Sequence, residues 1–169
     1  ESKNVKRLKN DSTNSEIHTA LGYFAKLPLF KEDIISKNYQ SLTPKFLLRY
    51  APGHMRATEG GRLNYGNLFN LNKLNKTDVV EPGLSSSVGF EYKKNRFNKS
   101  NIIGDEVFSL SAGQVISAKE NMDIPSSTSL DQRFSDIVGR AKYNINNDVN
   151  LKYNFFIDQG YKNFNYNEV

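Results

Sequence analysis

The chain's clearest pattern is an alternation of apolar and polar side chains between Val149 and Asp158, which only Phe156 interrupts. A period of two places alternate side chains on opposite faces of a β-strand. On a helix the same residues would scatter around the axis and leave no apolar stripe. The segment is therefore predicted to be a strand. Its apolar face consists of Val149, Leu151, Tyr153, Phe155 and Ile157.

The same alternation recurs along the rest of the chain. In residues 84–92, for example, Leu84, Val88 and Phe90 share one face and Glu91 lies on the other. Helical periodicity is confined to two short candidate turns. The sequence therefore predicts an all-β protein, an antiparallel meander of about eight strands. The further strand segments are residues 17–27, 42–50, 62–65, 84–92, 108–117, 137–145 and 163–167, and the candidate helical turns are residues 10–15 and 34–37.

The connections between these segments differ in length. Residues 146–148, Asn-Asn-Asp, predict a tight hairpin turn, because Asn and Asp tolerate a positive φ. Outer-membrane barrels have short turns on the periplasmic side and longer loops outside. The long connections fall opposite the 146–148 turn, as this architecture requires; they are residues 28–41, 67–79 and 119–133. Three connections fit less well, since 51–60 and 95–105 are long for the turn side and Gln159-Gly160 is tight for the loop side.

An antiparallel sheet with one apolar face fits either a soluble sandwich or a membrane barrel. Two features favour the barrel. The polar positions carry Ser, Asn and Gly with charges of both signs, which suits a wet interior, and Tyr50, Tyr92 and Tyr143 lie near strand ends, where barrels place interfacial aromatics. The high β-propensity of tyrosine is the alternative explanation. We therefore expect a polar lead-in over residues 1–16 and, over residues 17–169, a partial transmembrane β-barrel, part of a large outer-membrane barrel.

In such a barrel the two faces of each strand meet different surroundings. The polar face would line the lumen, and the apolar face would contact lipid. The lumen-facing candidates are Lys45, Arg49, Arg62, Glu91, Arg140, Lys142, Lys152 and Asn154. The lipid-facing candidates are Leu84, Val88, Phe90, Val149, Leu151, Tyr153, Phe155 and Ile157.

Composition narrows the classes of protein. The 169 residues include 23 Lys and Arg against 18 Asp and Glu, a net charge of +5, and 37% are hydrophobic. No stretch approaches the ~20 apolar residues of a membrane-spanning helix, and 11 Phe with 9 Tyr argue against a disordered chain. Without cysteine there is neither a disulfide nor a cysteine zinc site. The chain starts without Met and stops within an alternating pattern, so we interpret it as an internal piece of a longer protein.

The residues give little support to catalysis, metal binding or nucleic-acid binding. The two histidines, His18 and His54, are far apart, and a catalytic triad is recognised by geometry rather than by sequence position. No acidic spacing matches a calcium loop. The basic clusters around Lys6 and Lys93 have no aromatic recognition motif beside them. We expect no enzyme activity, metal, cofactor or nucleic-acid partner. A generic porin and a soluble β-sheet adhesin remain as alternatives.

Four segments carry motifs in a fixed order. Residues 42–50 read LTPKFLLRY; residues 67–73 and 78–81 read NLFNLNK and DVVE; Gly113-Gln114 follows; and residues 135–140 read SDIVGR, ahead of Leu151-Lys152-Tyr153. This set resembles the LptD family of outer-membrane proteins that assemble lipopolysaccharide, whose patterns are LTPxxxxR-Y/F, LFxxNRFSGxDRIE, SxGQ and SDIVGR…LxY. The resemblance covers roughly residues 17–169. The chain departs from it at residues 74–76, where Leu-Asn-Lys replaces Phe-Ser-Gly.

The resemblance implies a large barrel in the cell outer membrane that inserts lipopolysaccharide into the outer leaflet, with no bond made or broken. It also implies four partners: lipopolysaccharide, outer-membrane lipids, a plug lipoprotein and a periplasmic lipopolysaccharide-bridge protein. The lumen cations, such as Arg140 and Lys152, are candidates to contact the phosphates and sugars. The alternative is that they pair with Glu91, Asp158 and other acids and hold the lumen together.

Overall fold

The computed structural model describes residues 19–33, 35, 37–54, 61–74, 76, 79–97, 103–145, 149–158 and, by their backbone, 164–168. They form one antiparallel sheet and a short 3-10 helix, η1 (Ser126–Thr128), which confirms the all-β prediction. No helix in this described part is long and apolar enough to cross a membrane. The strands are β1 (Leu21–Lys26), β2 (Leu29–Asp33), β3 (Asn38–Ala51), β4 (Gly83–Phe97), β5 (Ile103–Ser117), β6 (Ile137–Asn144), β7 (Asn150–Ile157) and β8 (Phe164–Glu168).

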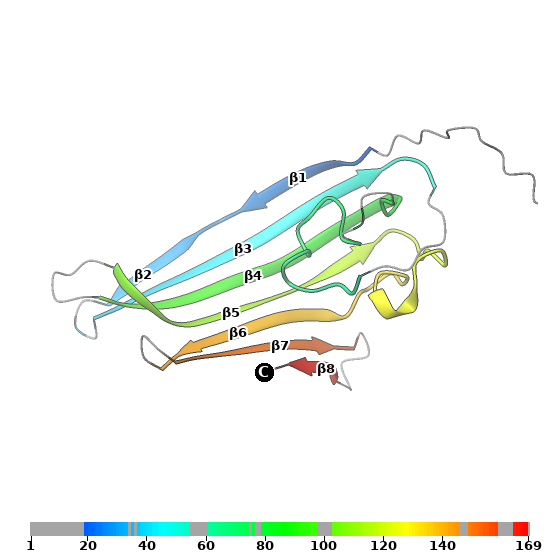
Figure 1. The fold of residues 1–169 in the computed structure, drawn as a ribbon. Coiled ribbons are helices and arrows are strands. Elements are labelled where there is room, and N and C mark those ends of the chain that lie inside the picture. The colour runs from blue at the N-terminus through cyan, green and yellow to red at the C-terminus, as the bar shows by residue number, and fades with distance from the viewer. Residues whose placement is uncertain are drawn as a thin grey trace, which may run out of the picture.

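The strands lie side by side in the order β1-β3-β4-β5-β6-β7-β8 (Figure 1). β2 also pairs with β3: β1 runs beside residues 45–50 of β3, and β2 runs beside residues 38–42. β1 and β2 therefore form one edge of the sheet together, and β8 forms the other. Among the described strands these two edges are not paired with each other, so this part of the chain does not close into a barrel.

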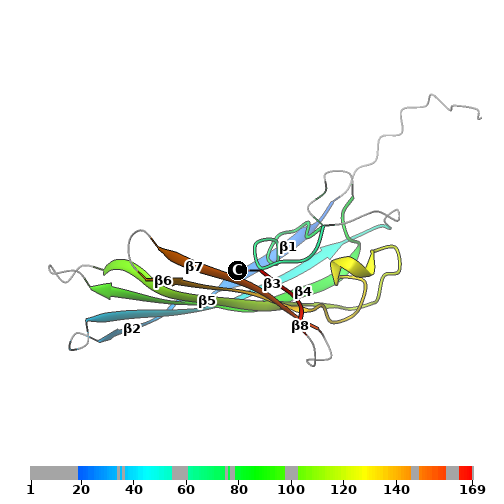
Figure 2. The same ribbon diagram turned by 60° about the horizontal axis from the view of Figure 1, so that its bottom comes forward.

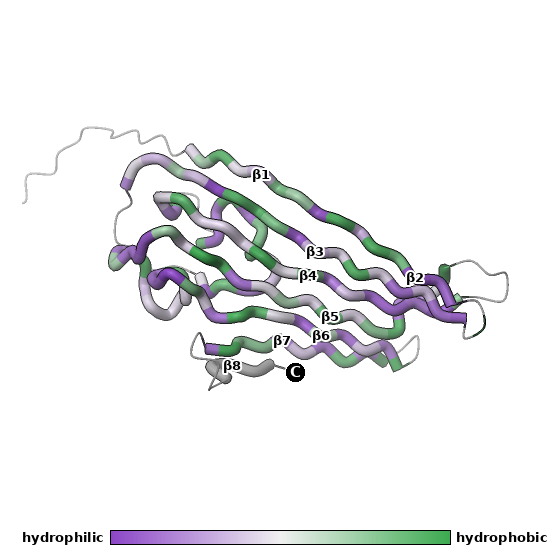
Figure 3. Tube along the Cα trace, turned by 180° about the vertical axis from the view of Figure 1, so that it is seen from behind, coloured by the Kyte–Doolittle hydropathy of each residue, from purple (hydrophilic) through white to green (hydrophobic). Residues whose placement is uncertain are grey.

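The register keeps the apolar side chains on one face of the sheet, which we call the outer face. Phe46 lies opposite Val88, and Tyr50 lies opposite Leu84. On the other face, the inner face, Arg140 lies opposite Asn154. Figure 3 shows hydrophobic and hydrophilic residues alternating along the strands. The exposed large apolar side chains of the outer face include Leu21, Tyr23, Leu29, Leu42, Phe46, Leu48, Tyr50, Leu84, Val88, Tyr143 and Leu151.

The connections at the two ends of the sheet differ in length. Residues 34–37, 98–102 and 145–149 join strands at one end, and the far longer connections 52–82 and 118–136 join strands at the other (Figure 1). The predicted side of connection 28–41 is wrong, because its turn at 34–37 lies at the same end as 145–149. The six-residue connection 158–163 between β7 and β8 lies at the end of the long connections, so the alternation of lengths is incomplete. The predicted turns at 146–148 and 159–160, and the candidate helical turn at 10–15, lie outside the described residues.

Two predicted elements are wrong, and both errors come from weak alternation. Residues 62–65 are not a strand: Leu63 is fully buried under connection 118–136, and its N–H bonds to the Thr128 carbonyl oxygen. Residues 28–41 are not a loop, because β2 folds back on β3 and Phe30 stacks on Tyr39 with 5.8 Å between ring centroids. Compared with the prediction, the strand at residues 62–65 is missing and β2 is an additional strand.

Two smaller expectations also need correction. Tyr50 and Tyr143 lie at strand ends on the outer face, as predicted, but Tyr92 lies inside β4, because β4 continues to Phe97. The candidate helical turn at 34–37 is a turn at its described residues, and Lys37 there has a φ of 50°. A positive φ is incompatible with a right-handed helix.

The sheet is curved, and the two long connections lie on its concave, inner face at one end (Figure 2). Their apolar side chains form a compact core against the strands. This core consists of Leu63, Leu68, Leu74, Val79, Ile124 and Leu130 from the connections, with Val115, Val138 and Phe156 from the inner face of β5, β6 and β7. The inner face is therefore covered by protein at one end and polar at the other.

Gly139 of β6 lies directly under the ring of Phe155 on β7. A Cβ atom at Gly139 would lie 2.1 Å from the Cζ atom of that ring. We expect Gly139→Ala to lower the free energy of unfolding by about 1–3 kcal/mol, the usual cost of overpacking. Urea unfolding in detergent micelles measures this change. Gly61→Ala is the control, since its Cβ would sit at an ordinary 3.4 Å from the Leu74 carbonyl oxygen. Recovery in Gly139→Ala/Phe155→Leu would support the clash, and equal losses for both glycines would contradict it.

Candidate functional site on the inner face

The uncovered part of the inner face carries two rows of polar side chains that cross the strands. The register aligns Lys93 of β4, Ser109 of β5, Lys142 of β6 and Lys152 of β7 in the first row. The second row is Thr43, Glu91, Ser111, Arg140 and Asn154. A period-two pattern on each strand therefore becomes a continuous polar band once the strands are in register.

Acidic side chains neutralise only part of this band. Glu91 bridges two lysines, with Oε2 2.7 Å from Lys45 Nζ and Oε1 3.0 Å from Lys93 Nζ. Glu106 Oε1 lies 3.6 Å from Lys142 Nζ. The remaining cations are Arg140, which donates to Asn154 Oδ1 at 3.0 Å, and Lys152. Five cations thus face two carboxylates across the band: Lys45, Lys93, Arg140, Lys142 and Lys152 against Glu91 and Glu106.

Lys142 and Lys152 are direct cross-strand partners. Like charges directly opposite each other in a sheet are destabilising. Lys152 forms no ion pair with any residue in the described part of the chain, and it is exposed. The pair therefore leaves a local excess of positive charge, which a multiply charged anion such as a phosphate group would neutralise.

Connection 52–82 docks into a slot on the inner face. Gly89 of β4 and Gly113 of β5 are direct cross-strand partners, so neither has a side chain to fill the space above them. Phe69 and Leu68 occupy that space: a Cβ at Gly89 would lie 3.2 Å from Phe69 Cζ, and one at Gly113 would lie 2.5 Å from Leu68 Cδ2. Tyr65 anchors the same segment, because its hydroxyl donates to the Phe90 carbonyl oxygen at 3.1 Å.

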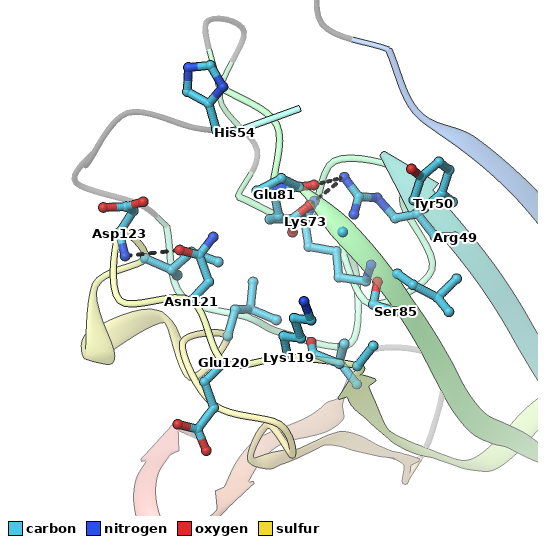
Figure 4. Close-up of a pocket in the computed structure, with 18 of the residues that line it drawn as sticks. Arg49, Tyr50, His54, Lys73, Glu81, Ser85, Lys119, Glu120, Asn121 and Asp123 are labelled. Carbon is cyan, nitrogen blue, oxygen red and sulfur yellow. Dashed lines mark hydrogen bonds and ion pairs between the residues drawn. The ribbon is translucent and has the colours of Figure 1, made fainter. Parts of the chain in front are cut away.

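A buried charged cluster fixes the end of this connection. Arg49 of β3 is 1% exposed, and its Nη2 lies 3.1 Å from Glu81 Oε2 and donates to the Glu81 carbonyl oxygen at 2.5 Å. Its Nε donates to the Leu71 carbonyl oxygen. Glu81 Oε1 accepts the backbone N–H of Lys73 at 3.0 Å. Figure 4 shows the contacts between Arg49 and Glu81, with Lys73 next to Glu81. The cluster ties residues 71–81 to β3.

Lys73 is also 1% exposed. Burial in this poorly solvated place lowers the pKa of Lys73 from its usual value of 10.5 to about 8. The nearby Glu81 carboxylate opposes this shift, and Arg49 adds to it. Desolvation is the largest cause, because a buried ammonium loses its hydration. Lys73 also lines a cavity of about 420 Å³ between connection 52–82 and the ends of β3, β4 and β5.

A second set of contacts holds connection 118–136 to the sheet. Gln114 Nε2 donates to the Ser135 carbonyl oxygen at 2.7 Å, and Ser135 Oγ accepts the Val115 N–H at 2.9 Å. Arg62 Nη2 lies 3.5 Å from Asp136 Oδ2. Arg62 also stacks over the Phe156 ring, at 4.6 Å. All four motif segments therefore have residues at this covered end of the inner face, whereas Leu151-Lys152-Tyr153 of the fourth lie at the other end of the sheet.

Most predicted site residues lie on the expected face. The lumen-facing candidates on the inner face are Lys45, Arg49, Glu91, Arg140, Lys142, Lys152 and Asn154. Arg62 lies in a connection and not on a strand, because the strand predicted at 62–65 does not form. The lipid-facing candidates Leu84, Val88, Phe90, Leu151, Tyr153, Phe155 and Ile157 lie on the outer face, and Val149 lies just before β7. Contact with lipid or saccharide stays a prediction for all of them.

Four charged residues of the site are absent from the sequence-based candidates. Lys73 and Glu81 lie within the motif segments, but their burial depends on contacts with a distant strand. Lys93 continues the alternation of β4. Glu106 follows a β-bulge between β4 and β5, which shifts its register. Lys93 was detectable from the alternation alone.

His54, the histidine that the structure describes, does not form a site with other metal ligands of the described residues. His54 lines the cavity beside Lys73, and His18 lies outside the described residues. Over the described ranges no group of three His, Cys, Asp or Glu side chains could hold a metal ion.

A comparison with known protein families shows which family this chain resembles over most of its length. The family model described as LptD, LPS transport system D, matches residues 25–169, which is most of the chain. A search of curated proteins finds no match.

Proposed function

The chain belongs to the LptD family of lipopolysaccharide transport proteins, and on this premise we propose that its sheet is part of the wall of an outer-membrane translocon barrel. The outer face contacts lipid, and the inner face contacts the phosphates and sugars of lipopolysaccharide during transport. The chemistry is binding and release along a polar surface, and no bond is made or broken. The protein is located in the cell outer membrane.

The observation that carries this proposal is the contrast between the two faces of one sheet. Exposed apolar side chains run across the outer face from β1 to β7, for example Leu21, Phe46, Leu84 and Leu151. A soluble monomer rarely exposes apolar patches larger than a few hundred Å². The inner face is polar and carries an excess of cations. This contrast fits a sheet that contacts lipid with its outer face and saccharide with its inner face.

The edges of the sheet fit the same proposal. β1 with β2, and β8, are edges with unpaired backbone groups in the described sheet. Backbone groups in lipid must be hydrogen-bonded, so only closed barrels span membranes with strands. Further strands of the barrel would pair with these edges. The long-connection end faces the cell exterior and the short-connection end faces the periplasm, as in other outer-membrane barrels.

The family also supports two protein partners as proposals. A periplasmic bridge protein would deliver lipopolysaccharide to the short-connection end, and a plug lipoprotein would occupy the lumen. The uncovered polar band is the part of the inner face that remains available to either the lipoprotein or the substrate.

The in-folded connection 52–82 favours a second candidate, a diffusion porin, because porins narrow their channel with a loop folded into the lumen. Single-channel conductance of the membrane-inserted protein separates the two. A translocon filled by its plug is expected to be nearly closed to ions, whereas a porin conducts steadily.

Photocrosslinking from neighbouring positions tests the proposal. A photoreactive residue at Lys152, on the inner face, is expected to give lipopolysaccharide adducts in cells that are transporting it. The matched control is Leu151, the next residue, which points outward at the short-connection end and should meet phospholipid. A lack of lipopolysaccharide adducts at 152 while transport proceeds, or equal yields at 151 and 152, would refute the proposed roles of the faces.

A further inference from the structure

The cavity at the long-connection end brings together polar side chains from separate parts of the chain. Lys73 and Glu81 come from connection 52–82, Ser85 comes from β4, and Ser117 comes from β5. Arg49 of β3 also lines the cavity. Its volume of about 420 Å³ is ample for a phosphate group with part of an attached sugar.

The Lys73 ammonium has no hydrogen bond or ion pair with any residue in the described ranges, although the side chain is buried. In Figure 4 it points toward Ser85 on the cavity wall. The Ser85 and Ser117 hydroxyls likewise form no hydrogen bond within those ranges. An ammonium offers three donors and each hydroxyl one. Lys73 is 1% exposed and Ser85 is 9% exposed, whereas Ser117 is half-buried at the cavity wall. A buried ammonium without a partner is unfavourable, so the geometry suits a ligand rich in acceptor oxygens.

The deep part of the cavity has a surplus of positive charge. Among the described residues deep in the cavity, Arg49 and Lys73 are opposed by Glu81. Its Oε1 accepts the Lys73 N–H, and its Oε2 lies 3.1 Å from Arg49 Nη2 as an ion pair without a hydrogen bond. Glu120 and Asp123 lie at the rim, and their carboxylates point away from Lys73 (Figure 4). The charged and titratable groups that line the cavity with Lys73 are Arg49, Tyr50, His54, Glu81, Lys119, Glu120 and Asp123.

We propose that this cavity binds an anionic group, a phosphate or carboxylate borne on the lipopolysaccharide saccharide, with Lys73 Nζ and the Ser85 and Ser117 hydroxyls as donors. The saccharide as the source rests on the proposed function, whereas the anion chemistry follows from the cavity. Arg49 contributes charge and forms an ion pair with the Glu81 carboxylate. Charge-assisted hydrogen bonds to phosphate oxygens are short and strong. The bound anion compensates the buried ammonium.

Calorimetric titration of the full membrane-inserted protein in detergent tests the site. The probes are glucose 6-phosphate, inorganic phosphate and glucose. We expect both phosphates to bind and glucose not to bind. Lys73→Met should raise the Kd at least about tenfold, and Lys31→Met, which removes an exposed lysine of β2 that does not line the cavity, should leave it unchanged. Tighter binding of glucose 6-phosphate than of inorganic phosphate supports a saccharide ligand. Equal Kd values for the two phosphates overturn the claim that the anion is borne on a saccharide.

The pH dependence provides a second readout. In the parent protein the affinity should fall above about pH 8, where Lys73 loses its proton. Lys73→Arg should keep the affinity without that fall, and it also serves if Lys73→Met does not fold. Absence of phosphate binding, or unchanged binding by Lys73→Met, overturns the site. Lipopolysaccharide adducts at position 152 would be unaffected by that failure, so the proposed function is tested separately.

Discussion

Arg49→Leu is expected to lower the free energy of unfolding by about 3–5 kcal/mol, the usual loss when one member of a buried ion pair is removed. The variant leaves the Glu81 carboxylate buried without the guanidinium 3.1 Å away. It also removes the donor to the carbonyl oxygens of Leu71 and Glu81. Urea unfolding of the membrane-inserted protein in micelles gives the free energy, with the folded fraction read from gel mobility.

Two further variants test whether the loss in the free energy of unfolding comes from the buried ion pair or would follow the removal of any arginine. Arg140→Leu removes an exposed arginine that donates to Asn154 at 3.0 Å, and it should cost about 1 kcal/mol or less. Arg49→Leu combined with Glu81→Leu should recover part of the loss, because the unpaired charge is gone as well. If Arg49→Leu is no worse than Arg140→Leu, the cluster does not hold the in-folded connection.

Lys73 is expected to make stability rise with pH in phosphate-free buffer. Its pKa is about 8 in the folded protein and near 10.5 when unfolded. Between these values the unfolded state binds more protons, so raising the pH favours the folded state. Below about pH 8 the full cost of burying the ammonium is present. The gain across this range is on the order of 3 kcal/mol, since one pKa unit corresponds to about 1.4 kcal/mol.

The measurement compares the urea stability of the parent with that of Lys73→Met from pH 7.5 to 10.5. Other lysines and tyrosines titrate in the same pH range. Both proteins contain them, so their contributions cancel when the stability of Lys73→Met is subtracted from that of the parent. The parent should gain stability relative to Lys73→Met as the pH rises. Lys73→Arg, whose charge does not change in this range, should behave like Lys73→Met. A constant difference between parent and Lys73→Met would contradict a depressed pKa at Lys73.

The sequence predicted best those features of the fold that follow from the two-residue period of a β-strand. The predicted strands at 84–92, 108–117, 137–145 and 149–158 are all present, some of them longer than predicted. Their apolar and polar faces are also as predicted, because side-chain direction in a strand depends only on the local period. Weak alternation misled at two places: residues 62–65 belong to a connection, and β2 forms where a loop was expected.

The sequence by itself thus determined the all-β class, the two opposite faces and the charged residues of the strands. The tertiary structure alone decided that connection 52–82 folds onto the inner face, with Leu68 and Phe69 over Gly89 and Gly113. It also decided that Lys73 meets Arg49 and Glu81. The reason is physical: strand periodicity is a local property, whereas a slot between two glycines or a buried ion pair exists only after distant segments are brought into register.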